Sequence, residues 1–168
     1  MIFLTVGSVL PFDRLVRLID DAVEDSIIEN EVFAQIGSGS YVPRRLEYVR
    51  FLEKRQYDDC LNRATAIIGH AGIGTINCAL KLNKPILVMP RRRENRELVD
   101  DHQLMTARKF SALGHVLTFS DRSELIEQLV ALGRFQPSPR KPNVEGIATV
   151  IGQYLTALSS HRSGSRPC

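Results

Sequence analysis

The stretch that decides the fold is Ile67-Ile68-Gly69-His70-Ala71-Gly72-Ile73-Gly74-Thr75-Ile76-Asn77-Cys78-Ala79-Leu80. Residues 66–68 read as the end of a buried strand, and residues 73–82 read as a helix. Glycines, a histidine and a threonine lie at the junction. A glycine-rich turn that leads into a helix N-terminus offers unpaired N–H groups at the positive end of the helix dipole, which favours phosphate. Residues 85–90 read as the next parallel strand, so we expect a β-α-β unit that holds the diphosphate of a nucleotide-sugar.

The junction differs from the two common phosphate-binding fingerprints. The dinucleotide pattern Gly-x-Gly-x-x-Gly requires a third glycine where Asn77 stands, and the pattern Gly-x-x-x-x-Gly-Lys-Ser/Thr is absent. A tight turn that needs glycine for its geometry alone therefore stays an alternative. The combination of His70, Gly72, Gly74 and Thr75 at one strand end favours an anion site.

The bulk properties indicate a single soluble domain. The chain has 168 residues, of which 43% are hydrophobic and 24% are charged. The sequence has no run of about 18 apolar residues, so we expect no transmembrane helix. Residues 1–4 read as a strand rather than a signal peptide. The 3 cysteines are widely spaced, which fits a reducing cytoplasm better than a zinc or disulfide framework. A net charge of +3 is too small to imply nucleic acid as a partner.

Short apolar runs alternate with helical patterns along the chain. The expected strands are residues 2–6, 32–36, 47–52, 66–68, 85–90 and 115–119, and the expected helices are residues 11–29, 56–64, 73–82, 98–113 and 120–132. This alternation predicts an α/β fold with a doubly wound parallel sheet.

The C-terminal part of the chain has a different composition. We expect the domain to cover residues 1–135, followed by a Pro-rich linker over 136–142, a helix over 143–158 and a disordered tail over 159–168. The helix carries apolar residues along one face. It either packs on its own sheet or docks on a partner, and both interpretations stay open.

Further polar segments follow strands at the edge where ligands bind in open α/β sheets. Gly7 and Ser8 follow the first strand, and a basic loop that begins with Arg91 follows the fifth. That loop is either merely solvated or contacts phosphate, and the turn over 37–40 has the same two interpretations. Gln103 lies near the start of the next helix, and its carboxamide can donate and accept hydrogen bonds at once, which suits sugar hydroxyls.

Four segments occur in an order that resembles one family: Thr5-Val6-Gly7-Ser8 with residues 11–15, Gln35-Ile36-Gly37, residues 69–75, and residues 84–90 with Asp101-His102-Gln103. Over about residues 1–135 they resemble the C-terminal, donor-binding domain of glycosyltransferase family 28. The chain looks most like the PssE-type subunits of bacterial exopolysaccharide transferases. These are similar to the catalytic subunit of the eukaryotic dolichol-linked GlcNAc transferase and to the C-terminal half of MurG. The resemblance implies a Rossmann-like half of a GT-B fold.

The resemblance also implies a reaction and a partner. A hexose would pass from a UDP-sugar to a polyprenyl-diphosphate-linked saccharide with inversion at the anomeric carbon, without a metal ion or other cofactor. The acceptor-binding half would be a separate, membrane-anchored PssD-like subunit, which would hold this chain at the cytoplasmic face of the membrane. In the absence of this partner, the surface that the partner would cover would be available for self-association of the chain.

The same resemblance implies roles for single residues. Gly7 and Ser8 would approach the diphosphate or the acceptor, Gln103 would hold the transferred sugar, and His70 would contact a phosphate or sugar oxygen. His70 and Gln103 are therefore the candidate catalytic residues. The candidate ligand-binding residues are Gly7, Ser8, Gly72, Ile73, Gly74, Thr75, Arg91, His102 and Gln103.

Two departures from the family pattern leave ribose recognition and the donor sugar open, respectively. Cys78 stands where relatives carry a glutamate that binds the ribose hydroxyls, and only Glu97 matches the Glu-His-Arg that precedes Asp-His-Gln in many members. Two other classes of function stay open. The chain could be a non-catalytic, nucleotide-sugar-binding scaffold subunit, or a standalone flavodoxin-like or epimerase-like domain.

Overall fold

The computed structural model describes residues 1–139 and 148–156. Its strands form one sheet in the order β3-β2-β1-β4-β5-β6, and all neighbouring strands are parallel. The strands are β1 (Ile2–Thr5), β2 (Val32–Gln35), β3 (Glu47–Val49), β4 (Ala66–His70), β5 (Ile86–Met89) and β6 (Leu117–Thr118). This is the strand order of the Rossmann fold, so the predicted doubly wound sheet is confirmed.

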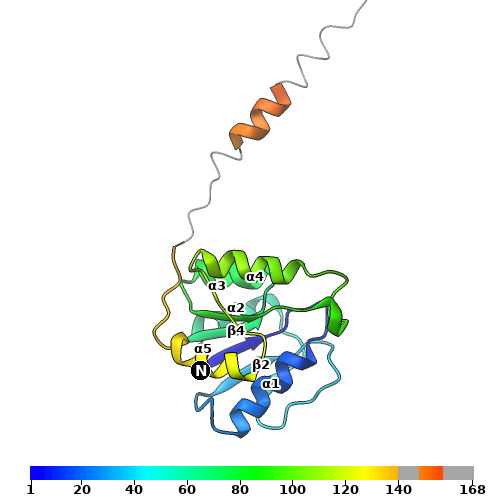
Figure 1. The fold of residues 1–168 in the computed structure, drawn as a ribbon, viewed down its shortest axis with the longest axis vertical. Helices are drawn as coiled ribbons and strands as arrows, with labels where there is room; N and C mark the ends of the chain where they lie inside the picture. Colours follow the sequence, from blue (N-terminus) through cyan, green and yellow to red (C-terminus); the bar gives the residue numbers. More distant parts are fainter. Residues whose placement is uncertain (140–147, 157–168) are drawn as a thin grey trace, which may run out of the picture.

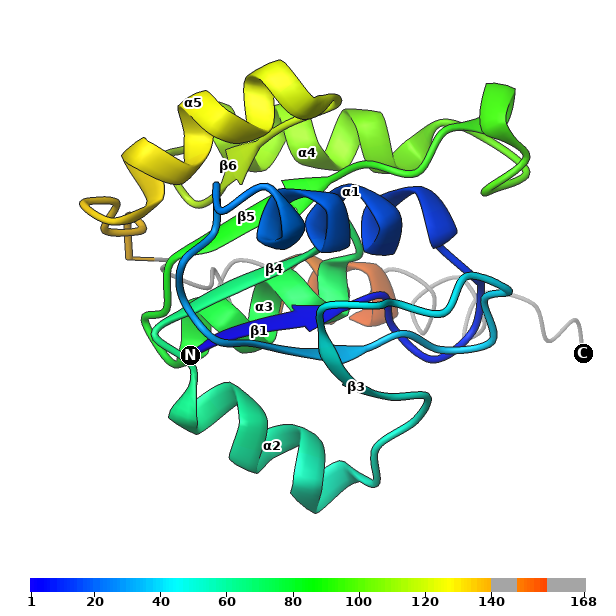
Figure 2. The ribbon, with the colours of Figure 1, turned by 90° about the horizontal axis from the view of Figure 1, so that it is seen from below.

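Helices cover both faces of the sheet (Figures 1 and 2). They are α1 (Asp13–Glu24), α2 (Lys54–Arg63), α3 (Ile73–Lys81), α4 (His102–Ala112) and α5 (Arg122–Leu132), with a 3-10 turn η1 (Arg93–Asn95) before α4. Helices α1 and α5 pack on one face with Leu4 of β1, whereas α2, α3 and α4 pack on the other with Phe3. Successive side chains of a strand point to opposite faces, so β1 contributes to both hydrophobic cores and is buried throughout.

The strand order places a crevice at the carboxyl ends of β1 and β4. The chain leaves β1 toward β2 and leaves β4 toward β5, so the two connections diverge at the point where the strand order reverses. Open α/β sheets bind ligands at this switch point. The glycine-rich junction after β4 and the loop over residues 7–10 after β1 therefore face the same space.

Helix α1 is shorter than expected because the chain turns after Glu24. Ser26 adopts a positive φ of 58°, and the N–H groups of Ile27 and Ile28 both donate to the carbonyl of Ala22, over 2.9 and 3.1 Å. The predicted end at residue 29 was wrong because this turn instead carries Ile28 into the core.

Helix α4 begins at His102, four residues later than predicted. Two carboxylates hold the preceding segment outside the helix: Glu97 accepts the N–H of Arg92 over 2.9 Å, and Asp101 accepts the N–H of Arg93 over 2.9 Å. Smaller boundary differences occur at β3, which ends at 49 rather than 52, and at α2, which begins at 54 because a capping box forms around its first turn.

The ordered domain extends beyond the predicted boundary at residue 135. Pro137 is buried, and Ser138 donates its N–H to the carbonyl of Gly114 over 2.8 Å while its own carbonyl lies 2.8 Å from Nδ1 of His115. Residues 148–156 are helical and exposed. The rest of the predicted linker and final helix (140–147 and 157–158) and the predicted tail (159–168) lie outside the described residues. No helix in the described part of the chain is long and apolar enough to cross a membrane.

Candidate functional site

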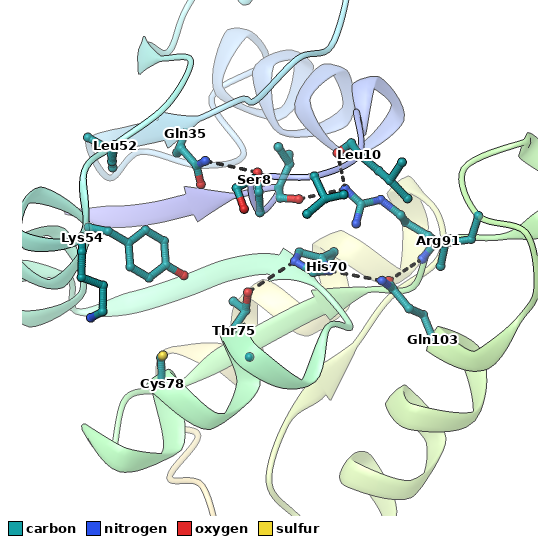
Figure 3. A pocket seen from close by; sticks show the side chains of 16 residues that line it. Ser8, Leu10, Gln35, Leu52, Lys54, His70, Thr75, Cys78, Arg91 and Gln103 are labelled. Carbon is teal, nitrogen blue, oxygen red and sulfur yellow. Dashed lines mark hydrogen bonds between the residues drawn. The ribbon is translucent and has the colours of Figure 1, made fainter.

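A cavity of about 620 Å³ opens at the carboxyl ends of β1, β2, β4 and β5 (Figure 3). Its lining includes the candidate residues Gly7, Ser8, His70, Gly74, Thr75, Arg91 and Gln103. Of the residues that the structure describes, no aspartate or glutamate lines this cavity, whereas Lys54 and Arg91 do. The cavity therefore suits an anionic ligand. Among residues 1–139 and 148–156, no group of three or more His, Cys, Asp or Glu side chains is placed to hold a metal ion.

The structure does not bring all candidate residues to this cavity. Gly72 caps the N-terminus of α3, and the side chain of Ile73 in the next position is 51% exposed. His102 is exposed, and its ring pairs with the carboxylate of Asp100 outside the cavity. Gln103 turns inward instead and is only 4% exposed. The neighbours His102 and Gln103 thus lie in different environments.

The N-terminus of α3 is open toward the cavity. The first bond within the helix runs from the N–H of Ile76 to the carbonyl of Gly72 over 3.1 Å, so the helix itself leaves the N–H groups of residues 73–75 unused. A Cβ added at Gly74 would meet no protein atom within 4 Å. Packing therefore does not require glycine at position 74, and any side chain there would enter the space in front of the helix.

Gly72 has a different role because it makes room for His70. A Cβ at Gly72 would lie 2.1 Å from Cε1 of the His70 ring, and a Cβ at Gly7 would lie 2.8 Å from its Nε2. The ring is thus held between two backbone segments. Nδ1 of His70 lies 3.2 Å from the amide nitrogen of Gln103, and Nε2 lies 3.3 Å from the hydroxyl of Thr75. Burial and the positive charge of Arg91 lower the pKa of His70 to about 4, so the ring is neutral at pH 7.

Arg91 differs from the other arginines of the predicted basic loop because its side chain is buried. Its side chain is 4% exposed, and one terminal nitrogen donates to the carbonyls of Val6 and Leu10 over 2.8 and 2.7 Å. Burial lowers the pKa of Arg91 to about 10, so the guanidinium stays charged at pH 7. Its Nε has no hydrogen-bond partner in the described structure. Arg91 thereby ties the end of β5 to the loop after β1, whereas Arg92 and Arg93 do not line the cavity.

Besides several apolar residues, the cavity is lined by three residues with polar side chains that sequence reasoning missed: Gln35, Lys54 and Tyr57. Gln35 accepts the hydroxyl of Thr5 over 2.6 Å and donates to the carbonyl of Gly7 over 3.1 Å, so it orders the loop after β1. A glutamine at the end of an apolar strand was a usable signal. Lys54 and Tyr57 had no comparable signal in the sequence, because α2 lies beside the cavity only as a result of the order of the strands in the sheet.

Comparisons with known proteins agree with this geometry. The glycosyltransferase family 28 C-terminal domain model matches residues 1–148. The human UDP-N-acetylglucosamine transferase subunit ALG13 is 32% identical over 124 residues, which are 68% of this chain and 10% of the human protein. The chain thus spans about a tenth of the length of this relative.

Solved structures share the fold. The NMR solution structure of ALG13 superimposes with a TM-score of 0.59 at 23% identity, over 84% of this chain and 90% of that one. The crystal structure of Acinetobacter baumannii MurG gives a TM-score of 0.55 at 22% identity, over 77% of this chain and 40% of that one. At such identities the likeness supports the fold alone, but the family match covers most of the sequence. The chain therefore belongs to the glycosyltransferase family 28 C-terminal domain family.

Proposed function

We propose that this chain is the donor-binding, catalytic subunit of a glycosyltransferase that moves a hexose from a UDP-sugar. The observation that carries the proposal is the open N-terminus of α3, which faces a cavity without carboxylates at the switch point of the sheet. The family membership supports it. So does the name of the relative ALG13, which describes a UDP-N-acetylglucosamine transferase subunit.

The geometry suits the charge that develops in this reaction. An acceptor hydroxyl attacks the anomeric carbon from the face opposite UDP, the new glycosidic C–O bond forms, and the C–O bond to UDP breaks with inversion. Negative charge then grows on the leaving diphosphate. The unused N–H groups of residues 73–75, the dipole of α3 and the hydroxyl of Thr75 would stabilise that charge in place of a metal ion. A base on the acceptor-binding partner would take the proton of the hydroxyl.

The partner is part of the proposal. We infer a membrane-anchored, PssD-like subunit that supplies the acceptor, a polyprenyl-diphosphate-linked saccharide of exopolysaccharide synthesis, and that keeps this chain at the cytoplasmic face of the membrane. Exposed apolar side chains support a protein interface. Val9 beside the cavity is 82% exposed, Val99 in the segment before α4 is 87% exposed, and the helix over 148–156 exposes further apolar residues.

Calorimetric titration with UDP and a panel of UDP-hexoses tests the donor site. Gly74→Val should abolish binding because its side chain fills the space in front of α3. Gly152→Val is the matched control: Gly152 is also helical and also has open space at its Cβ, but it lies outside the cavity. Unchanged binding by Gly74→Val would place the site elsewhere. Failure of the wild-type chain and of its complex with the partner to bind any UDP compound would overturn the proposal.

A non-catalytic scaffold subunit is the second candidate function. It is favoured by Cys78, which lines the cavity where relatives have a ribose-binding glutamate. Turnover by the complex separates the two functions. Thr75→Val should strongly reduce turnover if this chain binds the reacting donor, whereas a scaffold would support the same turnover with or without this hydroxyl.

A further inference from the structure

Four residues around the cavity are joined by a continuous series of hydrogen bonds (Figure 3). The backbone N–H of Arg91 donates to Oε1 of Gln103 over 3.1 Å. Nε2 of Gln103 lies 3.2 Å from Nδ1 of His70, and Nε2 of His70 lies 3.3 Å from Oγ1 of Thr75. The series therefore connects the end of β5 to the first turn of α3.

The first bond determines how the Gln103 amide is oriented. A backbone N–H can only donate, so the atom of Gln103 that faces Arg91 must be the carbonyl oxygen. The amide nitrogen then faces Nδ1 of His70, and this nitrogen also only donates. Nδ1 must therefore accept, which requires it to be unprotonated. A neutral imidazole with a bare Nδ1 carries its proton on Nε2.

The protonated Nε2 determines in turn what the Thr75 hydroxyl can do. Nε2–H donates to Oγ1 of Thr75, so the hydroxyl keeps its own proton for another acceptor. The Tyr57 side chain is hydrogen-bonded to Thr75 and Thr5, and burial raises the pKa of Tyr57, which keeps the phenol protonated. An anionic ligand in the cavity would compete with the neutral Tyr57 oxygen for the Thr75 proton, and the charged acceptor forms the stronger hydrogen bond.

We propose that Gln103 and His70 are positioning residues that lock one imidazole tautomer, so that the hydroxyl of Thr75 donates to the diphosphate of the bound nucleotide. The role of Thr75 rests on the proposed function, because it requires a diphosphate in this cavity. His70 transfers no proton in this arrangement, since its only lone pair is already used by Gln103. The ring occupies space that a side chain at Gly7 or Gly72 would fill, so glycine at both positions permits these bonds.

The tautomer can be measured without any ligand. Long-range ¹H–¹⁵N correlation spectra of the ¹⁵N-labelled full chain at pH 7 report the protonated nitrogen of each of the 4 histidines, and His70→Asn identifies the signal of His70. We expect His70 to carry its proton on Nε2 alone. A proton on Nδ1, or the mixture of tautomers of an unconstrained ring, would overturn the proposal whatever the chain binds.

The direction of the Thr75 hydroxyl is tested by UDP titration in a double-mutant cycle. Thr75→Val should weaken binding about tenfold or more, as expected for a hydrogen bond to a charged group. Gln103→Glu should move the proton of His70 to Nδ1, which makes Nε2 an acceptor and turns the Thr75 hydroxyl toward the ring. Gln103→Glu and the double variant Gln103→Glu/Thr75→Val should then bind UDP equally weakly.

Gln35→Glu is the matched charge control, because Gln35 is the other buried amide of the cavity and is bonded to Thr5 and Gly7 rather than to His70. In the Gln35→Glu variant, His70 should still carry its proton on Nε2, and adding Thr75→Val should still weaken UDP binding about tenfold. If Thr75→Val binds UDP as tightly as wild type, the proposed hydroxyl contact is wrong. If wild type itself fails to bind UDP, the proposed function fails and the role of Thr75 with it, while the tautomer of His70 is still decided by the spectra.

Discussion

At the scale of single residues, the site depends on side chains whose polar atoms already form hydrogen bonds within the protein. His70 lies against the bare backbone of Gly7 and Gly72, and both of its ring nitrogens have partners. A neutral imidazole cannot attract a phosphate by charge. In the proposed site the attraction for a diphosphate would come from the N-terminus of α3, from Arg91 and from hydroxyl donors, so His70 would matter chiefly for the geometry of its neighbours.

Neutral His70 predicts a specific dependence of stability on pH. Its folded-state pKa of about 4 lies below the ordinary 6.5 because of burial and Arg91, so between these pH values the unfolded chain binds more protons than the folded chain. Its contribution is therefore fully present above pH 6.5 and is lost as the pH falls toward 4, in total about 3 kcal/mol. Urea unfolding at pH 7.5 and pH 5 should show a loss of stability that is about 2 kcal/mol larger for wild type than for His70→Asn. Equal losses in the two proteins would contradict the burial of a neutral ring.

Cys78 predicts how the site treats the ribose. Within the described part of the chain, no carboxylate lines the cavity to accept hydrogen bonds from the ribose hydroxyls, so the wild-type chain should bind UDP and 2′-deoxy-UDP with similar affinity. Cys78→Glu adds such an acceptor and should favour UDP over the deoxy compound by about tenfold. Calorimetric titration of both nucleotides measures the ratio. A strong preference of the wild-type chain for UDP over 2′-deoxy-UDP would show that another group binds the 2′-hydroxyl of the ribose.

At the scale of elements, one arginine joins three segments around the crevice. Arg14 of α1 forms two hydrogen bonds with the carboxylate of Glu97, over 2.7 and 2.8 Å, and also donates to the carbonyls of Pro90 and Ser120. Glu97 in turn accepts the N–H of Arg92. Helix α1, the segment after β5 and the loop between β6 and α5 are thus held together, which fixes the loop that begins at Arg91.

Removing this arginine should cost far more stability than removing an exposed one. Arg14→Ala leaves the Glu97 carboxylate, which is only 10% exposed, without its charged partner, so we expect a loss of about 2 kcal/mol. Arg122→Ala removes an exposed pair with Asp25 and should cost less than about 0.5 kcal/mol. Urea unfolding of both variants makes the comparison. Similar losses would mean that the Arg14 contacts contribute no more than a surface pair.

At the scale of the whole molecule, the described domain is half of a GT-B fold with apolar surface left uncovered. In the helix over 148–156 the side chains of Val150, Ile151, Tyr154 and Leu155 are all exposed. They recur at spacings of one, three and four, which places them on one side of a helix. Such a side is usually buried against another protein surface.

This surface predicts an effect on association without an effect on folding. Replacing Ile151 and Leu155 by serine should leave the urea midpoint of the domain unchanged, because neither side chain is buried. It should reduce any self-association of the isolated chain and its binding to the proposed acceptor-binding subunit. Sedimentation velocity measures both effects. A lowered midpoint would instead show that the helix packs on its own domain.

Much of the fold was predictable because it rests on local patterns. The alternation of apolar runs with helical periodicity predicts the strands and helices, and parallel pairing follows from their alternation. Residues 69–75 predict the strand–turn–helix unit and the open helix N-terminus, since glycine and helix geometry are local properties. The helix boundaries at residues 24 and 102 were not predictable in this way, because apolar periodicity does not report the hydrogen bonds that decide them. These are a turn into the core and two carboxylates that accept backbone N–H groups earlier in the same segment.

The sequence by itself determined the layered α/β architecture, the glycine-rich junction and the family motifs, because each depends on residues close together in the chain. Only the tertiary structure decided which polar side chains meet. Three consecutive arginines look alike in the sequence, yet Arg91 alone is buried, since the carbonyls that it binds lie more than 80 positions away on the loop after β1. The contact between His70 and Gln103 spans 33 positions. Such pairs are brought together by the strand order around the switch point, which local residue patterns do not specify.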